Sequence, residues 1–314
     1  MPDHSATILI ATRNRAGSLR ETLASLGRVV VPSGCPVEAI VIDSGCTDGT
    51  PDAVAAAAAA STTIPLRLLR EAHPGKSRAL NAGVAAARGE ALLFSDDDVR
   101  FPPDWVGSMC GPVWRGELDG VAGKVRLAPH LERAWMTRTH YDRLADTRFM
   151  PRQTGVMIGA NMAVARRVFD RGLRFDVDLG PGAAGLEEDT LLSMQMWAAG
   201  FRVAAAPDCV VEHHPDPSRL TRRAWLAHAE AAGRSLAYLQ HHWERRAARL
   251  TGVRGTACSV LLRCYRLARR PAGTDAEGCD RREIRLAQLR AYYAAARALR
   301  GLPPKYDRGP QGRQ

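Results

Sequence analysis

Three consecutive aspartates, Asp96, Asp97 and Asp98, close a mainly apolar run from Ala91 to Ser95. The run is typical of a short buried strand, and carboxylates crowded at its end repel one another. Such a cluster is most stable when a cation neutralises it, and oxygen ligands on a turn suit Mg²⁺ or Mn²⁺. A metal bound in this way, with coordination positions left open, can hold a diphosphate. A solvated acidic turn is the other interpretation, so the rest of the chain has to decide.

The first hundred residues alternate between apolar runs typical of strands and stretches typical of helices. Thr50 is expected to cap the second helix, with Pro51 in the first helical position. This alternation predicts an α/β fold in which helices cover both faces of a mostly parallel sheet. We expect strands at 6–11, 37–42, 66–69 and 91–95, and helices at 18–26, from 50 onward and at 76–88.

Polar clusters at 12–15, 43–45 and 96–98 each follow a predicted strand. Because ligands of parallel sheets bind at the carboxyl ends of the strands, we expect the three clusters to lie at the same edge. The sequence from about 119 to 212 is less regular. A glycine-rich loop at 179–185 precedes a predicted helix at 189–199 and a predicted strand at 202–206.

The charge of the chain changes near Pro215. Residues 215–314 hold 21 Lys and Arg against 8 Asp and Glu, a net charge of +13, whereas residues 1–214 have a net charge of −2. We expect a catalytic domain at 1–214, a basic helical region at 215–301 and a disordered tail at 302–314. Helices in the basic region are predicted at about 219–247, 257–270 and 281–300.

Basic surfaces favour partners that carry phosphate, such as anionic lipid heads, lipid diphosphates and nucleic acid, although solvated Arg-rich helix faces explain the charge equally well. No apolar run approaches the roughly 20 residues that a membrane-spanning helix needs. The seven cysteines are scattered without a Cys-x-x-Cys pair, which argues against structural zinc and a disulfide framework. We therefore expect a cytoplasmic protein, with a possible peripheral position at the inner face of the membrane.

Several segments, taken in order, resemble the family 2 glycosyltransferases, which have the nucleotide-sugar-binding GT-A fold. Each segment alone is a weak signal, but the ordered set is specific and spans about residues 6 to 214. The segments that carry the resemblance lie at 11–15, 41–50, 75–83, 86–90, 94–99, 103–105, 159–162, 188–190 and 207–213.

The resemblance implies roles for individual residues by position. Asp96 and Asp98 match the two aspartates of an Asp-x-Asp motif, of which the first meets the ribose side of the donor and the second binds Mn²⁺ or Mg²⁺. His213 stands where some family members supply a further metal ligand. Glu188 and Asp189 resemble the acidic pair at the acceptor face, with Asp189 as the general base. The implied donor-binding residues are Thr12, Arg15, Asp43, Lys76, Asn81, Asp96, Asp97, Gly159 and Asn161.

Elementary chemistry agrees with these roles. A departing diphosphate needs its charge stabilised, and a metal ion held by Asp98 can do this as a Lewis acid. One carboxylate on the opposite side of the sugar is enough to take the proton of the attacking hydroxyl, which gives a single displacement with inversion. The resemblance thus implies a metal-dependent, inverting transferase of one sugar. UDP-sugars are the first choice of donor, GDP- and dTDP-sugars stay open, and the acceptor is a hydroxyl on a lipid-linked glycan or a natural product.

The basic rear of the chain is expected to form the acceptor side and to meet an anionic membrane surface. Trp225, Tyr238 and Trp243 could contact sugars there, although core packing is the better explanation for at least one of them. Nucleic acid is not an expected partner.

Simpler roles remain open for several of these residues. Asp43 could cap a turn, and Asp189 could stand at a helix start because the helix dipole favours an acid there. His213 could be structural, and Lys76 could be a solvated residue of the first helical turn.

Two other protein classes also remain open. A nucleotidyltransferase would need a glycine-rich loop after the first strand, where residues 12–15 are Thr-Arg-Asn-Arg. A non-catalytic protein that binds RNA or membrane through its basic helices would show salt-sensitive binding that survives loss of the acidic residues. A phosphate loop of the ATPase kind is excluded, because Arg70 stands where its first glycine is needed.

Overall fold

The computed structural model describes residues 4–61, 63–150, 155–246, 248–269 and 273–306. It divides into two units that we name by their main elements. The sheet unit comprises Met1–Arg133, Tyr141–Val177 and Glu188–Pro215, and the helical unit comprises Ala134–His140, Asp178–Glu187 and Asp216–Gln314. The residues predicted to form a tail lie partly outside the described residues, since the description ends at 306.

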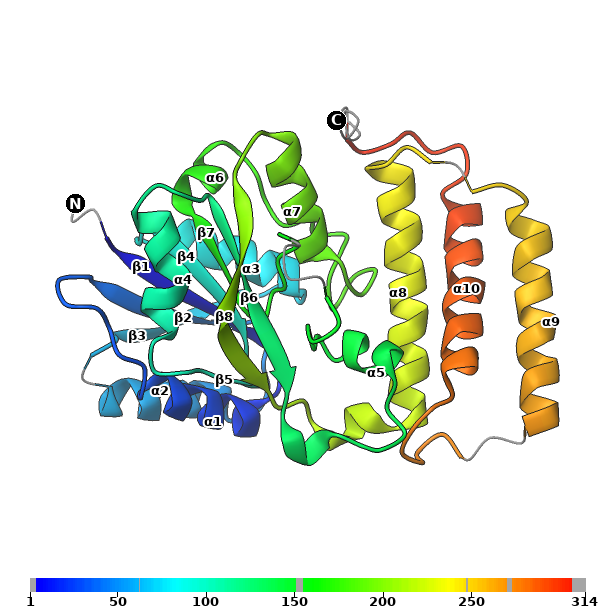
Figure 1. The fold of residues 1–314 in the computed structure, drawn as a ribbon, viewed down its shortest axis with the longest axis horizontal. Coiled ribbons are helices and arrows are strands. Elements are labelled where there is room, and N and C mark those ends of the chain that lie inside the picture. The colour runs from blue at the N-terminus through cyan, green and yellow to red at the C-terminus, as the bar shows by residue number, and fades with distance from the viewer. Residues whose placement is uncertain (1–3, 62, 151–154, 247, 270–272, 307–314) are drawn as a thin grey trace. The chain divides into compact units, whose positions relative to one another are not determined.

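One sheet runs through the sheet unit in the strand order β3-β2-β1-β4-β7-β6-β8-β5 (Figure 1). The strands β3, β2, β1 and β4 are parallel, β7 is antiparallel to both of its neighbours, β8 is parallel to β6, and β5 is antiparallel to β8. The bounds are β1 Ala6–Thr12, β2 Val37–Asp43, β3 Leu66–Arg70, β4 Ala91–Asp96, β5 Val99–Arg100, β6 Gly120–Leu127, β7 Met162–Ala165 and β8 Val203–His213.

The central strands are apolar on both faces because both faces are covered. Ile8, Leu9 and Ile10 of β1 are fully buried, and so are the residues from Leu92 to Phe94 of β4. Continuous burial of this kind is expected of parallel strands between two layers of helices. The α/β fold with a mainly parallel sheet, predicted from the sequence, is confirmed.

The helices of this unit pack on the sheet. The helix α3 lies against β1 and β2, and α4 lies against β4, β6 and β7; Figure 1 shows α4 in front of the sheet and α3 behind it. Gly83 of α3 lets the helix approach closely, since a Cβ there would lie 2.9 Å from Ile42. The bounds are α1 Ala16–Leu26, α2 Thr50–Ala60, α3 Lys76–Ala86, α4 Trp105–Trp114, α6 Arg166–Asp170 and α7 Glu188–Ala198, with a 3₁₀ turn at Pro129–Leu131. The short helix α5 Arg138–Arg143 contains residues assigned to both units.

Two local predictions were wrong. The helix α2 begins at Thr50 itself, whose hydroxyl donates to Asp48 at 2.6 Å, so Gly49 and not Thr50 stands in the capping position. The last long strand continues to His213, well beyond the predicted 202–206. Its pairing with β6 shifts between Gly123 and Lys124, and this irregularity accommodates residues 207–209, whose proline argues against a strand in the sequence.

The helical unit is built mainly from α8 Arg222–His242, α9 Thr251–Arg269 and α10 Arg281–Ala298, after a 3₁₀ turn at Pro217–Leu220. The helix α10 packs against both α8 and α9, and Figure 1 shows it between them. Gly233 makes the contact close, because a Cβ there would lie 2.3 Å from the carbonyl oxygen of Gln288. The three predicted helices are present, with α8 starting later than predicted because Thr221 caps it.

Among the described residues, no helix is both long enough and apolar enough to cross a membrane.

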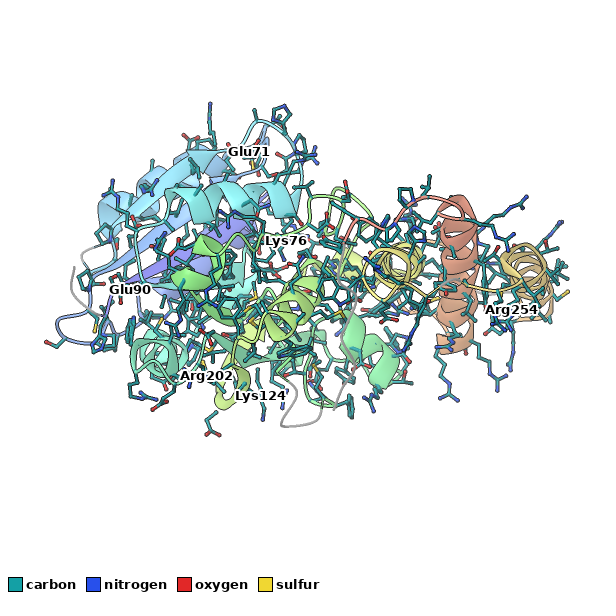
Figure 2. The ribbon with its side chains drawn as sticks, turned by 90° about the horizontal axis from the view of Figure 1, so that it is seen from above. Glu71, Lys76, Glu90, Lys124, Arg202 and Arg254 are labelled. Carbon is teal, nitrogen blue, oxygen red and sulfur yellow. The ribbon has the colours of Figure 1, made fainter. Side chains whose placement is uncertain are left out.

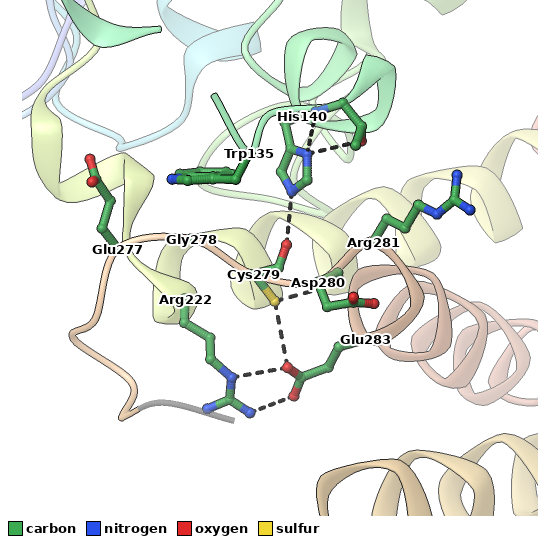
Figure 3. A pocket seen from close by; sticks show the side chains of 10 residues that line it. Trp135, His140, Arg222, Glu277, Gly278, Cys279, Asp280, Arg281 and Glu283 are labelled. Carbon is green, nitrogen blue, oxygen red and sulfur yellow. Dashed lines mark hydrogen bonds and ion pairs between the residues drawn. The ribbon is translucent and has the colours of Figure 1, made fainter. Parts of the chain in front are cut away.

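A buried carboxylate joins the helices of this unit. Glu283 of α10 is 1% exposed and accepts from the Nε of Arg222 at 2.9 Å and from the Nε of Arg266 at 2.7 Å. Burial would raise the pKa of Glu283, but the two guanidinium groups outweigh it and hold this pKa below its ordinary value. Glu283 and Arg222 line a cavity of about 430 Å³ together with Trp135, His140 and Cys279 (Figure 3).

Replacing Glu283 with glutamine is expected to lower the free energy of unfolding by about 2–4 kcal/mol, because it leaves the largely enclosed guanidinium of Arg222 without its counter-ion, whereas the half-exposed Arg266 stays partly solvated. Urea unfolding of the variant measures this. The matched control is Glu230→Gln, which breaks the more exposed pair of Glu230 with Arg290 between the same helices. That change should cost about 1 kcal/mol or less, and equal losses in both variants would contradict a special role for Glu283.

Candidate active site

The candidate site begins where β1, β2 and β4 end. Their register places Thr12 beside Asp43 and Ala11 beside Asp96. Parallel pairing therefore brings the three polar clusters that follow these strands to one edge of the sheet, as the sequence predicts. Four residues of this edge are nearly inaccessible to solvent: Thr12 3%, Asp43 3%, Asp97 4% and Asp98 2% exposed.

Arg15 neutralises part of the aspartate cluster. Its Nη1 lies 3.0 Å from Oδ1 of Asp97 and 3.1 Å from Oδ2 of Asp98, while the hydroxyl of Thr12 donates to Oδ2 of Asp97 at 2.7 Å. Burial raises the pKa of Asp97 to about 6, with Arg15 opposing the rise and the charge of Asp98 adding to it. The cluster thus carries more negative charge than its one guanidinium balances.

His213 faces the other side of Asp98. Its Nε2 lies 3.2 Å from Oδ1 of Asp98, and its Nδ1 bonds to the carbonyl oxygen of Leu144 at 2.7 Å. The pairing of Val99 with His213 between β5 and β8 sets this distance. A carbonyl at Nδ1 assigns the proton to that nitrogen, which leaves Nε2 as the face turned to the carboxylate.

Asp98 and His213 together offer an oxygen and a nitrogen ligand, a donor set that suits Mn²⁺. Within the described ranges, no group of three or more His, Cys, Asp and Glu side chains is arranged to enclose a metal. The pair therefore fits an ion that takes its remaining ligands from a diphosphate and water, and does not fit a closed structural site.

Lys76 connects this edge to a second acidic cluster. Its Nζ lies 2.6 Å from Oδ1 of Asp96 and 3.4 Å from Oε1 of Glu188 (Lys76 is labelled in Figure 2). Burial would lower the pKa of Lys76, but the charges of Asp96, Glu188 and Asp189 outweigh it and raise the pKa above its ordinary value. Lys76 does stand in the first turn of α3, but its side chain is only 18% exposed, so the solvated role considered for it is wrong.

Asp189 is held at the start of α7 by backbone donors. Its Oδ2 accepts from the N–H of Gly159 and its Oδ1 from the N–H of Thr190, each at 2.7 Å. A Cβ on Gly159 would lie 3.2 Å from Nζ of Lys76 and 3.5 Å from Oδ2 of Asp189. Glycine at 159 therefore keeps the space in front of both charged groups open.

Three residues predicted to bind the donor make hydrogen bonds within the protein. The side chain of Asn161 is fully buried; its Oδ1 accepts from Trp105, and its Nδ2 donates to the carbonyl oxygens of Lys124 and Cys209. Asn81 bonds the backbone of Phe175 in both directions. Asp43 accepts from the N–H of Cys46 at 2.6 Å, which is the turn-capping role considered from the sequence.

Asn14 and Asp48, for which no role was predicted, join the loops behind β1 and β2. Asn14, with a φ of 53°, accepts from the N–H of Thr47 at 2.7 Å. Asp48 accepts from the N–H of Ala16 at the first turn of α1, at 2.9 Å. The signal was present as two short polar side chains that commonly bond nearby backbone N–H groups.

The aromatic residues considered for sugar contact in the helical unit are mostly core residues. Trp225 is 1% exposed and donates its Nε1–H to the carbonyl oxygen of Leu220, and Trp243 is 6% exposed. The hydroxyl of Tyr238 lies 3.4 Å from Asp178.

Residues 7–173 match the sequence pattern of Glycosyl transferase family 2. The match covers more than half of the chain, and the chain belongs to this family of glycosyltransferases. The nucleotidyltransferase and the non-catalytic protein considered from the sequence are thereby set aside.

Individual relatives agree with this family. Succinoglycan biosynthesis protein ExoO from Rhizobium meliloti is 28% identical over 74% of this chain and 66% of that protein. Glucosyl-3-phosphoglycerate synthase from Mycolicibacterium paratuberculosis is 36% identical over 32% of this chain and 31% of that protein. The chain thus matches less than two thirds of the length of either curated relative.

The fold is also that of known glycosyltransferases. The mannosyltransferase PcManGT from Pyrobaculum calidifontis, solved in complex with GDP-Man and Mn²⁺, superimposes with a TM-score of 0.59 at 19% identity, over 94% of this chain and 86% of that chain. Similarity at this level of identity shows the GT-A fold of the chain.

The acidic cluster around Glu188 gives stability a dependence on pH. Burial raises the pKa of Glu188 to about 7, with Lys76 opposing the rise and Asp189 and Asp96 adding to it. Between its ordinary pKa and about 7, the folded protein keeps a proton that the unfolded chain has lost, so this group lowers stability as the pH rises through that window.

Glu188→Gln removes this titration. We expect its unfolding temperature, relative to the original protein, to shift upward as the pH is raised from 5 to 8, because glutamine never acquires the buried charge. Thermal unfolding across that range measures the shift. Glu90→Gln, at an exposed position, is the matched control and should give a flat difference. A flat or falling difference for Glu188→Gln would contradict the raised pKa.

Proposed function

We propose that this protein transfers a single sugar from a nucleotide diphosphate sugar to a hydroxyl-bearing acceptor, with inversion at the anomeric carbon. The observation that carries the proposal is that Lys76 links two acidic clusters with different partners. One contains Asp98 beside His213, and the other contains Glu188 and Asp189. Such a division suits a reaction that needs a charged leaving group on one side of a sugar and a base on the other.

Asp98 and His213 would hold Mn²⁺ or Mg²⁺, and this ion supplies neutralisation of the departing diphosphate when it is bound. Arg15, already within 3.1 Å of two aspartates, would add a second positive charge at the same edge. Positive groups that are fixed before the reaction stabilise developing negative charge without having to reorganise.

We assign the donor to the edge formed by the ends of β1, β2 and β4. Asp96 would face the ribose, with Thr12 and Asp43 near the base and Asp97 and Lys76 beside the diphosphate. Gly159 would leave room for the sugar ring. Asn81 and Asn161 would act on the donor through the backbone that they position, since their amide groups already bond protein partners.

Asp189 is the proposed general base. The acceptor hydroxyl oxygen forms a bond to the anomeric carbon while the bond from that carbon to the diphosphate oxygen breaks, with its electron pair going to the diphosphate. Asp189 takes the hydroxyl proton, and the N–H groups of Gly159 and Thr190 fix the orientation of its carboxylate. Attack from the side opposite the leaving group gives inversion.

The acceptor we propose is a hydroxyl on a lipid-linked glycan or a natural product, and we propose that the protein works in the cytoplasm at an anionic membrane surface. The charge of +13 over residues 215–314 supports this partner. UDP-sugars remain the first choice of donor. The GDP-Man bound to PcManGT supports keeping GDP-sugars as the second choice.

Calorimetric titration of the purified protein with UDP, GDP and dTDP, each with and without Mn²⁺, tests the proposal. We expect one nucleotide to bind at least tenfold more tightly than the others and to need the metal. No binding of any nucleotide under either condition would overturn the proposed function, whereas equal binding with and without Mn²⁺ would overturn the role of the metal.

A further inference from the structure

The helix α9 exposes an unusual amount of apolar surface. Val253 is 69%, Val260 52%, Leu261 55% and Leu267 77% exposed, and Leu250, just before the helix, is 62% exposed. Of the twelve large apolar side chains that are exposed in the described part of the chain, five lie between residues 250 and 267. Scattered exposed apolar residues need no explanation, but a contiguous patch indicates a surface that meets a partner.

The helical repeat places these residues in one line. Val253, Val260 and Leu267 follow one another at intervals of seven residues, which is close to two turns, and Leu261 and the small Ala257 lie beside them. The opposite face of α9 carries the buried Cys258 and Leu262 and packs on α10. The helix therefore has two apolar faces, of which packing within the helical unit uses one.

Positive charge borders the exposed line on both sides. Arg254 lies about 100° from Val253 around the helix, and Arg263 lies about 60° from Val260 in the other direction. Both arginines are exposed, and Arg254 is labelled in Figure 2. The whole of α9 carries four arginines and no aspartate or glutamate.

This charge distribution indicates which partner the exposed apolar line of α9 fits. A second copy of α9 laid on the first would bring arginines against arginines with no carboxylate on either helix, which is unfavourable. An anionic bilayer offers the complementary arrangement, with an apolar interior and phosphates above it. An apolar line bordered by arginines is the pattern of helices that lie in the membrane interface, where long side chains reach back to the headgroups.

We propose that α9 lies in the plane of an anionic lipid bilayer, with Val253, Val260 and Leu267 at the acyl boundary and Arg254 and Arg263 on lipid phosphates. The inference deepens the proposed function, because it names the surface through which the protein reaches a membrane. It does not depend on donor or metal binding.

Co-sedimentation of the full chain with vesicles tests the proposal. We expect binding to phosphatidylcholine vesicles that contain phosphatidylglycerol, and at least about tenfold weaker binding to phosphatidylcholine alone or at high salt. The variant with Val253→Ser, Val260→Ser and Leu267→Ser should lose about tenfold or more in binding to the anionic vesicles. Arg254→Gln with Arg263→Gln should bind the anionic vesicles about tenfold or more weakly than the original protein, with a smaller dependence on salt.

The matched control is Val30→Ser, which removes an apolar side chain that is 63% exposed in the sheet unit, and it should bind vesicles as the original protein does. The proposal would be overturned if the original protein does not bind anionic vesicles. A triple serine variant that binds them unchanged would overturn it too, as would self-association of the original protein that this variant abolishes. Nucleotide titration of each variant separates the membrane proposal from the proposed function. Loss of nucleotide binding would concern the donor site alone and would leave the vesicle result to be interpreted by itself.

Discussion

Asp189→Asn is expected to lower the rate of sugar transfer by about 10²- to 10⁴-fold, the usual contribution of a positioned general base. Asparagine keeps the size of the side chain and one acceptor for the N–H groups of Gly159 and Thr190, but it cannot take the acceptor's proton. Donor binding should change little. Steady-state transfer rates at saturating donor, together with nucleotide titration, measure both quantities.

The control for Asp189 addresses its position at a helix start. Asp52 is an exposed acid in the first turn of α2, where it can interact with the helix dipole as Asp189 does in α7. Asp52→Asn should leave the transfer rate unchanged. If Asp189→Asn also keeps its rate while both variants lose a few tenths of a kcal/mol of stability, the dipole explains the acid and the base lies elsewhere.

Asp98→Asn is expected to reduce the metal-dependent rate by about 10²- to 10⁴-fold, since a metal contributes several kcal/mol to the stabilisation of transition-state charge and each 1.4 kcal/mol is about tenfold. An amide oxygen is a weaker ligand than a carboxylate. Initial rates measured over a series of Mn²⁺ concentrations should show that the variant needs a much higher Mn²⁺ concentration to reach half of its maximal rate. His213→Asn should raise this concentration as well, because the two side chains lie 3.2 Å apart.

Asp104→Asn is the matched control, because Asp104 is an exposed aspartate that bonds Ser108 at the start of α4. Its metal requirement should equal that of the original protein. Thermal unfolding without metal separates a lost ligand from a lost fold, since a folded Asp98→Asn variant melts cooperatively. If the folded variant depends on Mn²⁺ as the original protein does, Asp98 is not a metal ligand.

The part of the fold that could be predicted is the part whose signal is local. The strands from Ala6 to Asp96 are mainly apolar runs separated by helices, and the predicted and observed segments coincide closely. The edge of the sheet could be predicted too, because parallel strands place their carboxyl ends together. The antiparallel strand β7 was not predicted, because Met162–Ala165 is too short for a periodic signal.

The parts of the candidate site that could not be predicted depend on contacts between distant segments. Nothing local to Lys76 indicates that Asp96 and Glu188 surround its amine, and nothing local to Asn161 indicates that its amide bonds the backbone of two other strands. The family resemblance placed these residues near the site, but it did not say which of them touch open space. Burial decided that for Asn161, which is fully enclosed.

The order of strands in the sheet has a consequence for how the protein is made. A chain growing from its N-terminus can pair β1 with β2 and β4 as soon as residue 96 is available, since these partners are near in sequence. The two residues of β5 pair with β8, so Val99 meets His213 only after 114 further residues have been added. The three aspartates are therefore synthesised long before the imidazole, and a growing chain can bring the two proposed metal ligands together only with the last strand of its sheet.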